Sequence, residues 1–199
     1  MRFDLATIAS WIEPQSRVLD LGCGCGDLLV HLRTDKNVFG TGIEQDEAKV
    51  SECIGKGLSV IHGDINQEVE DYPDQAFDTI IVSQTLQQVY APATLLAKLL
   101  RIGRRVVVSF PNFAHWSIRL CILFSGKVPI TNELPYMWYE TPNIRIITLK
   151  GFREFAKEKG FVILKETAIN TGADLEQGHI VRVLPNLRAR QGIMLISRS

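Results

Sequence analysis

The sequence predicts an α/β fold built around a mostly parallel β-sheet, and three observations lead to that prediction. Apolar runs of strand length alternate with amphipathic segments of helix length through the first 110 residues. The first such strand, residues 18–21, breaks into a series of glycines before helical spacing begins. Residues 77–83 are almost continuously apolar, as expected of a strand that helices cover on both faces.

Length and composition are those of an ordinary globular protein. The 199 residues are 46% apolar and 22% charged, so we expect one domain, residues 1–199, with a substantial core. Lysine plus arginine and aspartate plus glutamate both number 22, and the formal net charge is zero. Nucleic-acid binders usually carry a basic excess, and no apolar run has the length of a membrane span. We therefore expect neither a nucleic-acid nor a membrane partner.

The other elements follow from periodicity, caps and breakers. Asp46 is predicted to cap the helix after the second strand, and Pro92 to open a helix that Gly103 ends. The predicted helices span about residues 5–12, 27–33, 47–56, 92–102, 114–124 and 152–160. The predicted strands span residues 18–21, 37–44, 58–65, 77–83, 106–110, 161–166 and 193–196, and a polar loop is predicted at 170–178.

The glycine turn after the first strand identifies a class of ligand. Gly22, Gly24 and Gly26 stand at alternate positions, so backbone can approach a ligand closely. A phosphate-binding P-loop needs Lys-Ser/Thr after its last glycine, and a dinucleotide fingerprint has different glycine spacing. Asp20 and Asp27 flank this turn, and two carboxylates would repel a pyrophosphate but attract a cation. S-adenosylmethionine fits, because it has an ammonium, a sulfonium and no phosphate; a turn without a ligand is the alternative.

The four cysteines do not have the spacing of a zinc or redox motif. Cys23 and Cys25 fill small positions between the turn glycines, and we count Cys23 among the cofactor contacts. Free thiols predict a reducing compartment, hence the cytoplasm. Redox chemistry at Cys25 is a minor alternative.

Polar residues at the ends of later strands extend the predicted cofactor site. Glu44, with Gln45 beside it, ends the second strand, where a carboxylate can accept hydrogen bonds from both hydroxyls of a ribose. Asp64 follows the third strand and can accept the amine of an adenine, against which Ile65 can lie. Ser83 ends the central strand and completes the set. Taken alone, each of these acids could equally be a solvated strand end.

The first 110 residues resemble the class I S-adenosylmethionine-dependent methyltransferases, and the whole chain resembles the methionine biosynthesis protein MetW family. The second resemblance rests on Ser-Phe-Pro-Asn-Phe-Ala-His-Trp at 109–116, on Leu-Pro-Tyr-Met-Trp-Tyr-Glu-Thr-Pro-Asn-Ile at 134–144 and on Leu-Pro-Asn-Leu at 184–187. It implies a Rossmann-like fold with seven strands, the last antiparallel, and helices on both faces. It also implies S-adenosylmethionine or S-adenosylhomocysteine as ligand and homoserine O-acyltransferase as partner. Arg145 departs from the family, in which we expect histidine.

Residues 111–147 are irregular and rich in aromatic side chains, which predicts a lid or a partner-binding insertion. Two functions follow. In the first, the chain binds the cofactor and activates or regulates homoserine O-acyltransferase, with the insertion as docking surface. In the second, it is a small-molecule methyltransferase of unknown acceptor, with His115 or Tyr139 as candidate base. We favour the first; the sequence leaves the oligomeric state open.

Overall fold

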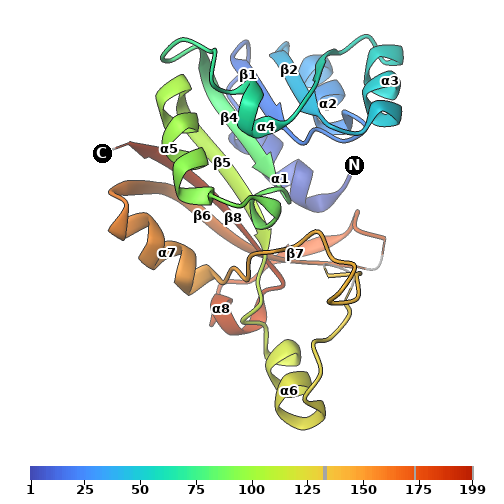
Figure 1. The fold of residues 1–199 in the computed structure, drawn as a ribbon, viewed down its shortest axis with the longest axis vertical. Coiled ribbons are helices and arrows are strands. Elements are labelled where there is room, and N and C mark those ends of the chain that lie inside the picture. Colours follow the sequence, from blue (N-terminus) through green and yellow to red (C-terminus); the bar gives the residue numbers. More distant parts are fainter. Residues whose placement is uncertain (132–133, 173, 199) are drawn as a thin grey trace.

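A computed structural model describes residues 1–131, 134–172 and 174–198 (Figure 1). Residues 132–133 in the predicted insertion, 173 in the predicted polar loop and 199 lie outside the described residues. The helices are α1 (Phe3–Trp11), α2 (Asp27–Lys36), α3 (Glu47–Gly55), α4 (Ile65–Glu68), the 3₁₀ turn η1 (Leu86–Gln88), α5 (Pro92–Ile102), α6 (Trp116–Ser125), α7 (Leu149–Glu158) and α8 (Pro185–Arg188). The strands are β1 (Arg17–Leu21), β2 (Phe39–Glu44), β3 (Ser59–His62), β4 (Phe77–Ser83), β5 (Gly103–Pro111), β6 (Phe161–Thr171), β7 (Gly178–Ile180) and β8 (Gln191–Arg198).

The strands form one sheet in the order β3-β2-β1-β4-β5-β8-β6-β7. Strands β1 to β5 pair in parallel, and β8 is antiparallel to both β5 and β6. The mostly parallel sheet and the antiparallel last strand are therefore confirmed. The chain runs outward from β1 to β3 and then returns to β4 on the other side of β1. Such a reversal is where ligands bind beyond the carboxyl ends of parallel strands.

Within the described residues the sheet has eight strands, and the prediction of seven is wrong by one. The additional strand β7 pairs antiparallel with the end of β6, which extends to Thr171. Part of the predicted polar loop is thus a short hairpin. All three residues of β7 are exposed, so they show no alternation of apolar and polar side chains that could have revealed an edge strand.

Helices cover both faces of the sheet. Successive residues of a strand point to opposite faces, so each strand places apolar side chains on both. On one face, Leu19 and Ile80 pack with α5 and α7 in a large apolar cluster. On the other face, their neighbours Val18 and Ile81 pack with α1 and α2. On the first of these faces α5 packs against β5 and α7 packs against β6 (Figure 1). The three-layer packing, helix on sheet on helix, holds the carboxyl ends of the parallel strands in fixed positions.

The insertion leaves the body of the protein between β5 and α7. Helix α6 projects away from the sheet, and the chain returns from it to α7 through an irregular path (Figure 1). The predicted helix at 114–124 is confirmed, although it begins two residues later, because His115 caps it, and ends one residue later. Among the helices of the described residues, none combines the length and the apolar character that crossing a bilayer requires.

Candidate functional site

The residues predicted to bind a cofactor meet at one edge of the sheet. Asp20 on β1, Glu44 on β2 and Ser83 on β4 stand at or near the carboxyl ends of their strands, and Asp64 follows β3. The glycine turn, residues 22–26, links β1 to α2 beside them. Because these four strands are parallel neighbours in the sheet, residues from four separate segments share one edge.

The three turn glycines have different surroundings, although all have φ between 57° and 77°. A Cβ on Gly22 would lie 2.7 Å from Oγ1 of Thr85, and one on Gly26 would lie 2.3 Å from Cδ1 of Leu58. A Cβ on Gly24 would meet no atom of the described residues within 4 Å. Packing therefore requires Gly22 and Gly26, whereas Gly24 keeps its backbone accessible to a ligand.

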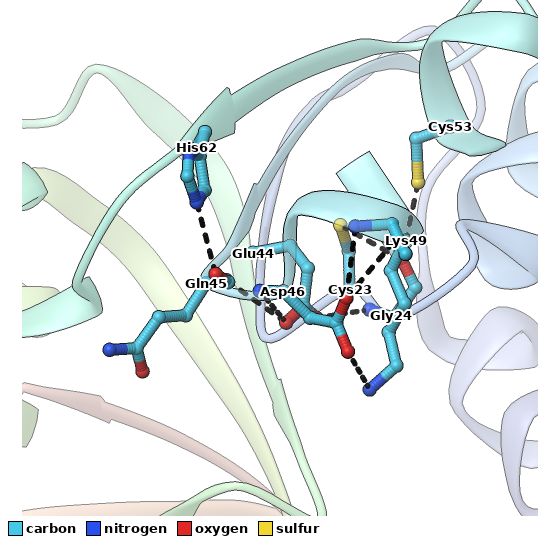
Figure 2. A network of polar contacts seen from close by, with 9 residues as sticks. Cys23, Gly24, Glu44, Gln45, Asp46, Lys49, Cys53 and His62 are labelled. Carbon is cyan, nitrogen blue, oxygen red and sulfur yellow. Dashed lines mark hydrogen bonds and ion pairs between the residues drawn. The ribbon is translucent and has the colours of Figure 1, made fainter. Parts of the chain in front are cut away.

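Glu44 is held against the turn by backbone N–H groups (Figure 2). Its Oε2 accepts from Gly24 at 2.8 Å, and its Oε1 accepts from Gln45 at 2.9 Å and from Asp46 at 3.0 Å. A carboxylate offers about four lone-pair sites, so roughly one site remains, on Oε2. One hydroxyl of a ribose could bind there directly, whereas the predicted pair of hydroxyls would have to replace a backbone bond. The side chain of Gln45 is exposed and points away from the turn (Figure 2).

Asp20 is a buried carboxyl group without a fixed partner. Its side chain is 3% exposed, and no group of the described residues donates a hydrogen bond to it. Burial, with a smaller contribution from the negative charge of Glu44, raises the pKa of Asp20 from about 3.8 to about 7. A cation bound beside it would favour the ionised form. Asp27, the other acid predicted to attract a cation, is instead paired with Lys56 at 2.9 Å.

The cysteines of the turn are protonated thiols rather than reactive thiolates. Burial raises the pKa of Cys23, and the negative charges of Asp20 and Glu44 add to the effect. Burial also raises the pKa of Cys53, whose Sγ lies 3.2 Å from the main-chain oxygen of Gly24 (Figure 2). A hydrogen bond with Glu52 raises the pKa of Cys25. Raised pKa values lower the nucleophilicity of these sulfurs at neutral pH, so they serve as small packing groups.

The remaining predicted contacts have structural partners of their own. Oδ1 of Asp64 accepts from the main chain and from the side chain of Asn66, both at 2.8 Å, and so caps α4. Ile65 is half-buried against the core. The hydroxyl of Ser83 lies 3.0 Å from the hydroxyl of Ser109 on β5. Asp64 retains a second oxygen for a ligand, while the hydroxyl of Ser83 is engaged toward β5.

A family model described as "Methionine biosynthesis protein MetW" matches residues 2–196. The chain belongs to the MetW family. A curated relative from Rhodopirellula baltica, "Bifunctional methionine biosynthesis protein MetXA/MetW", is 31% identical over 211 residues. The alignment includes all of this chain but 33% of that protein, so the chain spans about a third of the length of the curated relative.

Solved structures place the MetW chain in the class I methyltransferase fold. An S-adenosylmethionine-dependent methyltransferase from Archaeoglobus fulgidus superposes with a TM-score of 0.72 at 14% identity, over 98% of this chain and 91% of that one. The [4+2]-cyclase SpnF superposes with a TM-score of 0.61 at 16% identity, over 98% of this chain and 79% of that one. The predicted fold class is confirmed, and proteins with this fold include one named for a cyclisation.

Asn112 connects two of the sequence strings that carry the MetW resemblance. The side chain is 1% exposed, and its Nδ2 donates to the main-chain oxygens of Asn186 at 3.0 Å and Ala189 at 2.8 Å. Its Oδ1 accepts from the main chain of Ala114 at 3.2 Å and of Leu149 at 3.4 Å. Asn112 therefore links the strings at 109–116 and 184–187 and joins the end of β5 to α7 and to the tail of the chain.

The two candidate bases lie in different surroundings. His115 is 4% exposed and caps α6, with Nδ1 2.7 Å from Oγ of Ser117. Tyr139 is 64% exposed, and its ring packs edge-on against Trp138 at a centroid distance of 5.5 Å. Cap formation and aromatic packing account for these contacts, and neither contact involves the glycine turn.

Sequence analysis missed several residues in the loop after β4. Thr85 donates from Oγ1 to the main-chain oxygen of Leu21 at 3.2 Å and thereby packs this loop against the turn. Gln84 has a φ of 55°, which is uncommon for a residue other than glycine. Gln87 is 3% exposed, which is unusual for glutamine. A run of polar residues directly after the central strand was the available signal, but only the structure shows which of them are buried.

Arg145 fastens the end of the insertion to the same loop. Its Nε donates to the main-chain oxygen of Val89 at 3.3 Å, and Nη2 donates to that of Tyr90. The backbone N–H groups of Ile144 and Arg145 both donate to Gln87 O, at 2.9 and 3.0 Å. The insertion is therefore anchored next to the carboxyl end of β4, beside the candidate cofactor site.

Proposed function

We propose that this MetW chain binds S-adenosylmethionine or S-adenosylhomocysteine at the glycine turn and acts on a homoserine O-acyltransferase, which it activates or regulates. Residues 1–199 are taken as one domain, with the partner-binding insertion at 111–147. The observation that carries the partner role is the exposed apolar surface of that insertion. The comparisons support methionine biosynthesis as its setting.

Three features of the turn support the cofactor. Gly24 has open space on its backbone, the buried Asp20 carboxyl has no donor among the described residues, and Glu44 has about one acceptor site left. A ligand with a cationic amino-acid end and a ribose would complement all three. When bound, S-adenosylmethionine supplies a methyl group on a sulfonium. In our assignment Asp20 attracts the cationic end, Glu44 orients the ribose and Asp64 contacts the adenine.

The insertion exposes a set of large apolar side chains that a monomer would ordinarily bury. On α6 only Ile118 is buried, while Leu123 is 72% and Phe124 is 81% exposed. We call this the insertion surface; its other members are Trp116, Leu120, Ile122, Tyr136, Met137, Trp138 and Tyr139. Exposed apolar groups of this size and grouping mark interaction sites.

The fused relative supports the identity of the partner. Its name joins MetXA, the homoserine acyltransferase, with MetW in one polypeptide. The part of that protein outside the alignment is about twice as long as the aligned third. Fusion keeps two proteins at a high effective concentration, which benefits proteins that act together. We therefore assign the insertion surface to the acyltransferase rather than to a second copy of this chain.

A binding and activity assay with the cognate homoserine O-acyltransferase tests the proposal. Leu123→Ser combined with Phe124→Ser should weaken association by at least about thirtyfold, because buried apolar anchors of this kind should together contribute ~2 kcal/mol or more. Phe39→Ser is the matched control, since Phe39 is 70% exposed but lies on β2. The assay is run with and without S-adenosylmethionine. No association and no effect of the wild-type chain on acyltransferase activity would refute the partner role.

A second candidate function is methyl transfer to a small molecule. The observation in its favour is the superposition on an S-adenosylmethionine-dependent methyltransferase over 98% of the chain. His115 and Tyr139 remain the candidate bases, but each has a structural contact that explains its position. Calorimetry that shows cofactor binding, followed by no release of S-adenosylhomocysteine with any candidate acceptor, would exclude this activity.

A further inference from the structure

A cavity of about 270 Å³ lies where η1, the start of α5, the end of the insertion and the start of α7 meet. Its walls are mainly apolar: Leu86 is 2% exposed, Phe152 is 3% exposed and Phe155 is half-buried. Small-molecule sites are concave and mostly apolar, with a few polar groups that fix the orientation of the ligand. The volume is just below the roughly 300–1,000 Å³ of typical ligand pockets, so the cavity suits a small molecule.

Arg145 is the only charged side chain among the described residues that line this cavity. Its guanidinium is held in place, because Nε donates to the main-chain oxygen of Val89 and Nη2 donates to that of Tyr90. These two oxygens lie between Leu86 and Pro92, which both line the cavity, so the guanidinium lies at that wall. A guanidinium has five N–H groups, and these two bonds leave roughly three of them for a ligand.

No acidic group compensates the charge of Arg145. The ion pairs that arginines form among the described residues do not include it, and none of the described residues that line the cavity is acidic. The first residue of α5, Pro92, and the residue that caps α7, Thr148, also line the cavity. The start of a helix carries partial positive charge, so both helices add to the positive potential that Arg145 creates.

We propose that this cavity binds a small apolar carboxylate. The hydrocarbon body of the ligand lies against Leu86, Phe152 and Phe155, and its carboxylate binds the guanidinium of Arg145. The fork of N–H groups on a guanidinium matches the geometry of a carboxylate. A free amino acid suits the cavity less well, because its ammonium would lose water without an acidic partner among the described lining residues.

The proposal goes beyond the proposed function, because this cavity is separate from the glycine turn. Asp20, Glu44 and Asp64 do not line it. A ligand here would contact the loop after β4 at Leu86, whose neighbour Thr85 is bonded to the main chain just before the turn. It would also contact the end of the insertion at Arg145. The ligand would therefore lie between the proposed cofactor site and the insertion, without a contact to a nucleoside.

Hydrocinnamate and its primary amide, hydrocinnamide, are suitable probes, because they share an apolar body and differ in charge. Their binding to the full chain is measured by ligand-observed NMR. We expect hydrocinnamate to bind at least about tenfold more tightly than hydrocinnamide. Equal affinities, or no binding of hydrocinnamate, would overturn the proposal.

Gly151→Leu tests the place of the site by filling the cavity. Gly151 lies in the first turn of α7, and a Cβ there would lie 3.0 Å from Oγ1 of Thr148, which also lines the cavity. We expect both probes to bind at least about tenfold more weakly, while the melting temperature stays unchanged or rises, because leucine favours a helix more than glycine does. Gly55→Leu in α3 is the matched control, since a Cβ there meets no atom of the described residues within 4 Å.

Arg145→Gln tests the charge. Hydrocinnamate should bind about tenfold more weakly or worse, whereas hydrocinnamide should keep its affinity within about twofold. A purely structural role of Arg145 would instead weaken both probes equally, and that result would overturn the assignment of the carboxylate. Arg182→Gln is the matched control, because Arg182 is exposed and lines a different cavity.

The outcomes also separate this site from the cofactor site. Unchanged binding of hydrocinnamate in Gly151→Leu would overturn the place of the site. If Gly151→Leu fails to fold, Arg145→Gln still decides the question. A wild-type chain that prefers hydrocinnamate and loses this preference in Arg145→Gln, but does not bind S-adenosylhomocysteine, would support this site and contradict the proposed cofactor site.

Discussion

The glycine turn buries polar side chains, whereas the insertion exposes apolar ones. At the turn, Asp20 is 3% exposed and Glu44 accepts three backbone hydrogen bonds, so polar groups are buried and held in fixed positions. On α6 in the insertion, apolar groups are exposed, and Phe124 is 81% exposed. The first arrangement is the kind that suits a small polar ligand, whereas the second is the kind that suits contact with another apolar surface.

The two regions also differ in the sequence strings that they carry. The superposition on a methyltransferase at 14% identity extends over 98% of the chain and so includes both regions. Two of the sequence strings that carry the MetW resemblance, 109–116 and 134–144, lie in or beside the insertion. Substitutions in the two regions should therefore separate stability and cofactor binding from partner binding.

The largest effect on stability is expected from Gly26→Ala. A Cβ there would lie 2.3 Å from Leu58 and 2.9 Å from Sγ of Cys53, and φ is 77°. Overpacking and the left-handed conformation together should lower the free energy of unfolding by about 4 kcal/mol. Urea denaturation of the variant measures this loss. A loss below about 1 kcal/mol would contradict the packing role of Gly26.

Gly24→Ala is the control in the same turn. The added methyl group meets open space, so the cost of about 1–2 kcal/mol comes from φ alone. The methyl group would occupy the path of the ligand, so calorimetry should show strongly weakened binding of S-adenosylhomocysteine. Wild-type affinity in this variant would show that the ligand does not approach Gly24.

The next largest effect is expected where the two regions join. Asn112→Ala removes a buried side chain that makes four contacts to main-chain groups, and it leaves those groups without partners. We expect the free energy of unfolding to fall by about 3 kcal/mol. Asn66→Ala, an exposed asparagine in α4, should cost less than about 1 kcal/mol by the same denaturation assay. Similar losses for the two variants would refute the role of Asn112 as a junction.

Local signals predicted most of the fold. Residues 77–83 form β4 as predicted, Pro92 and Gly103 bound α5, and Asp46 caps α3 by accepting from two backbone N–H groups. Each of these features is decided by a few neighbouring residues, which a sequence displays directly. Strand β7 was missed because its three exposed residues pair only through the backbone with β6.

The candidate site was predictable in part. Asp20, Glu44 and Asp64 could be placed at one edge of the sheet, because each stands near the carboxyl end of a strand. The carboxyl ends of parallel strands lie at the same edge. The sequence could not show that Asp27 pairs with Lys56, 29 residues away. It could not show that Gln87 is buried either, because tertiary contacts determine the burial of a side chain.

Asp20 predicts a dependence on pH that the insertion should not share. Its pKa is about 7 in the folded chain, whereas the unperturbed value of about 3.8 applies to the unfolded chain. Between these two pH values the folded chain therefore binds more protons than the unfolded chain. Its contribution to stability is therefore full below pH ~4 and falls as pH rises through ~7. Between about pH 5 and 8, the wild type should lose about 2–3 kcal/mol relative to Asp20→Asn.

Cofactor binding should show the opposite trend. A cation beside Asp20 favours the ionised carboxylate, so affinity for S-adenosylmethionine should rise about tenfold between pH ~6 and ~8. Calorimetry at several pH values measures the trend, and Asp20→Asn should be flat in this range. A wild-type profile that is equally flat would mean that the cationic end of the ligand does not face Asp20.

The smallest effect on stability is expected from the substitutions that should weaken partner binding. Leu123→Ser with Phe124→Ser replaces side chains that are 72% and 81% exposed, so the free energy of unfolding should change by less than about 0.5 kcal/mol. Urea denaturation at two protein concentrations is the measurement. A concentration-dependent loss above about 1 kcal/mol would mean that α6 already packs against a second copy of the chain. The insertion surface would then be a self-interface, and the acyltransferase would need a different docking site.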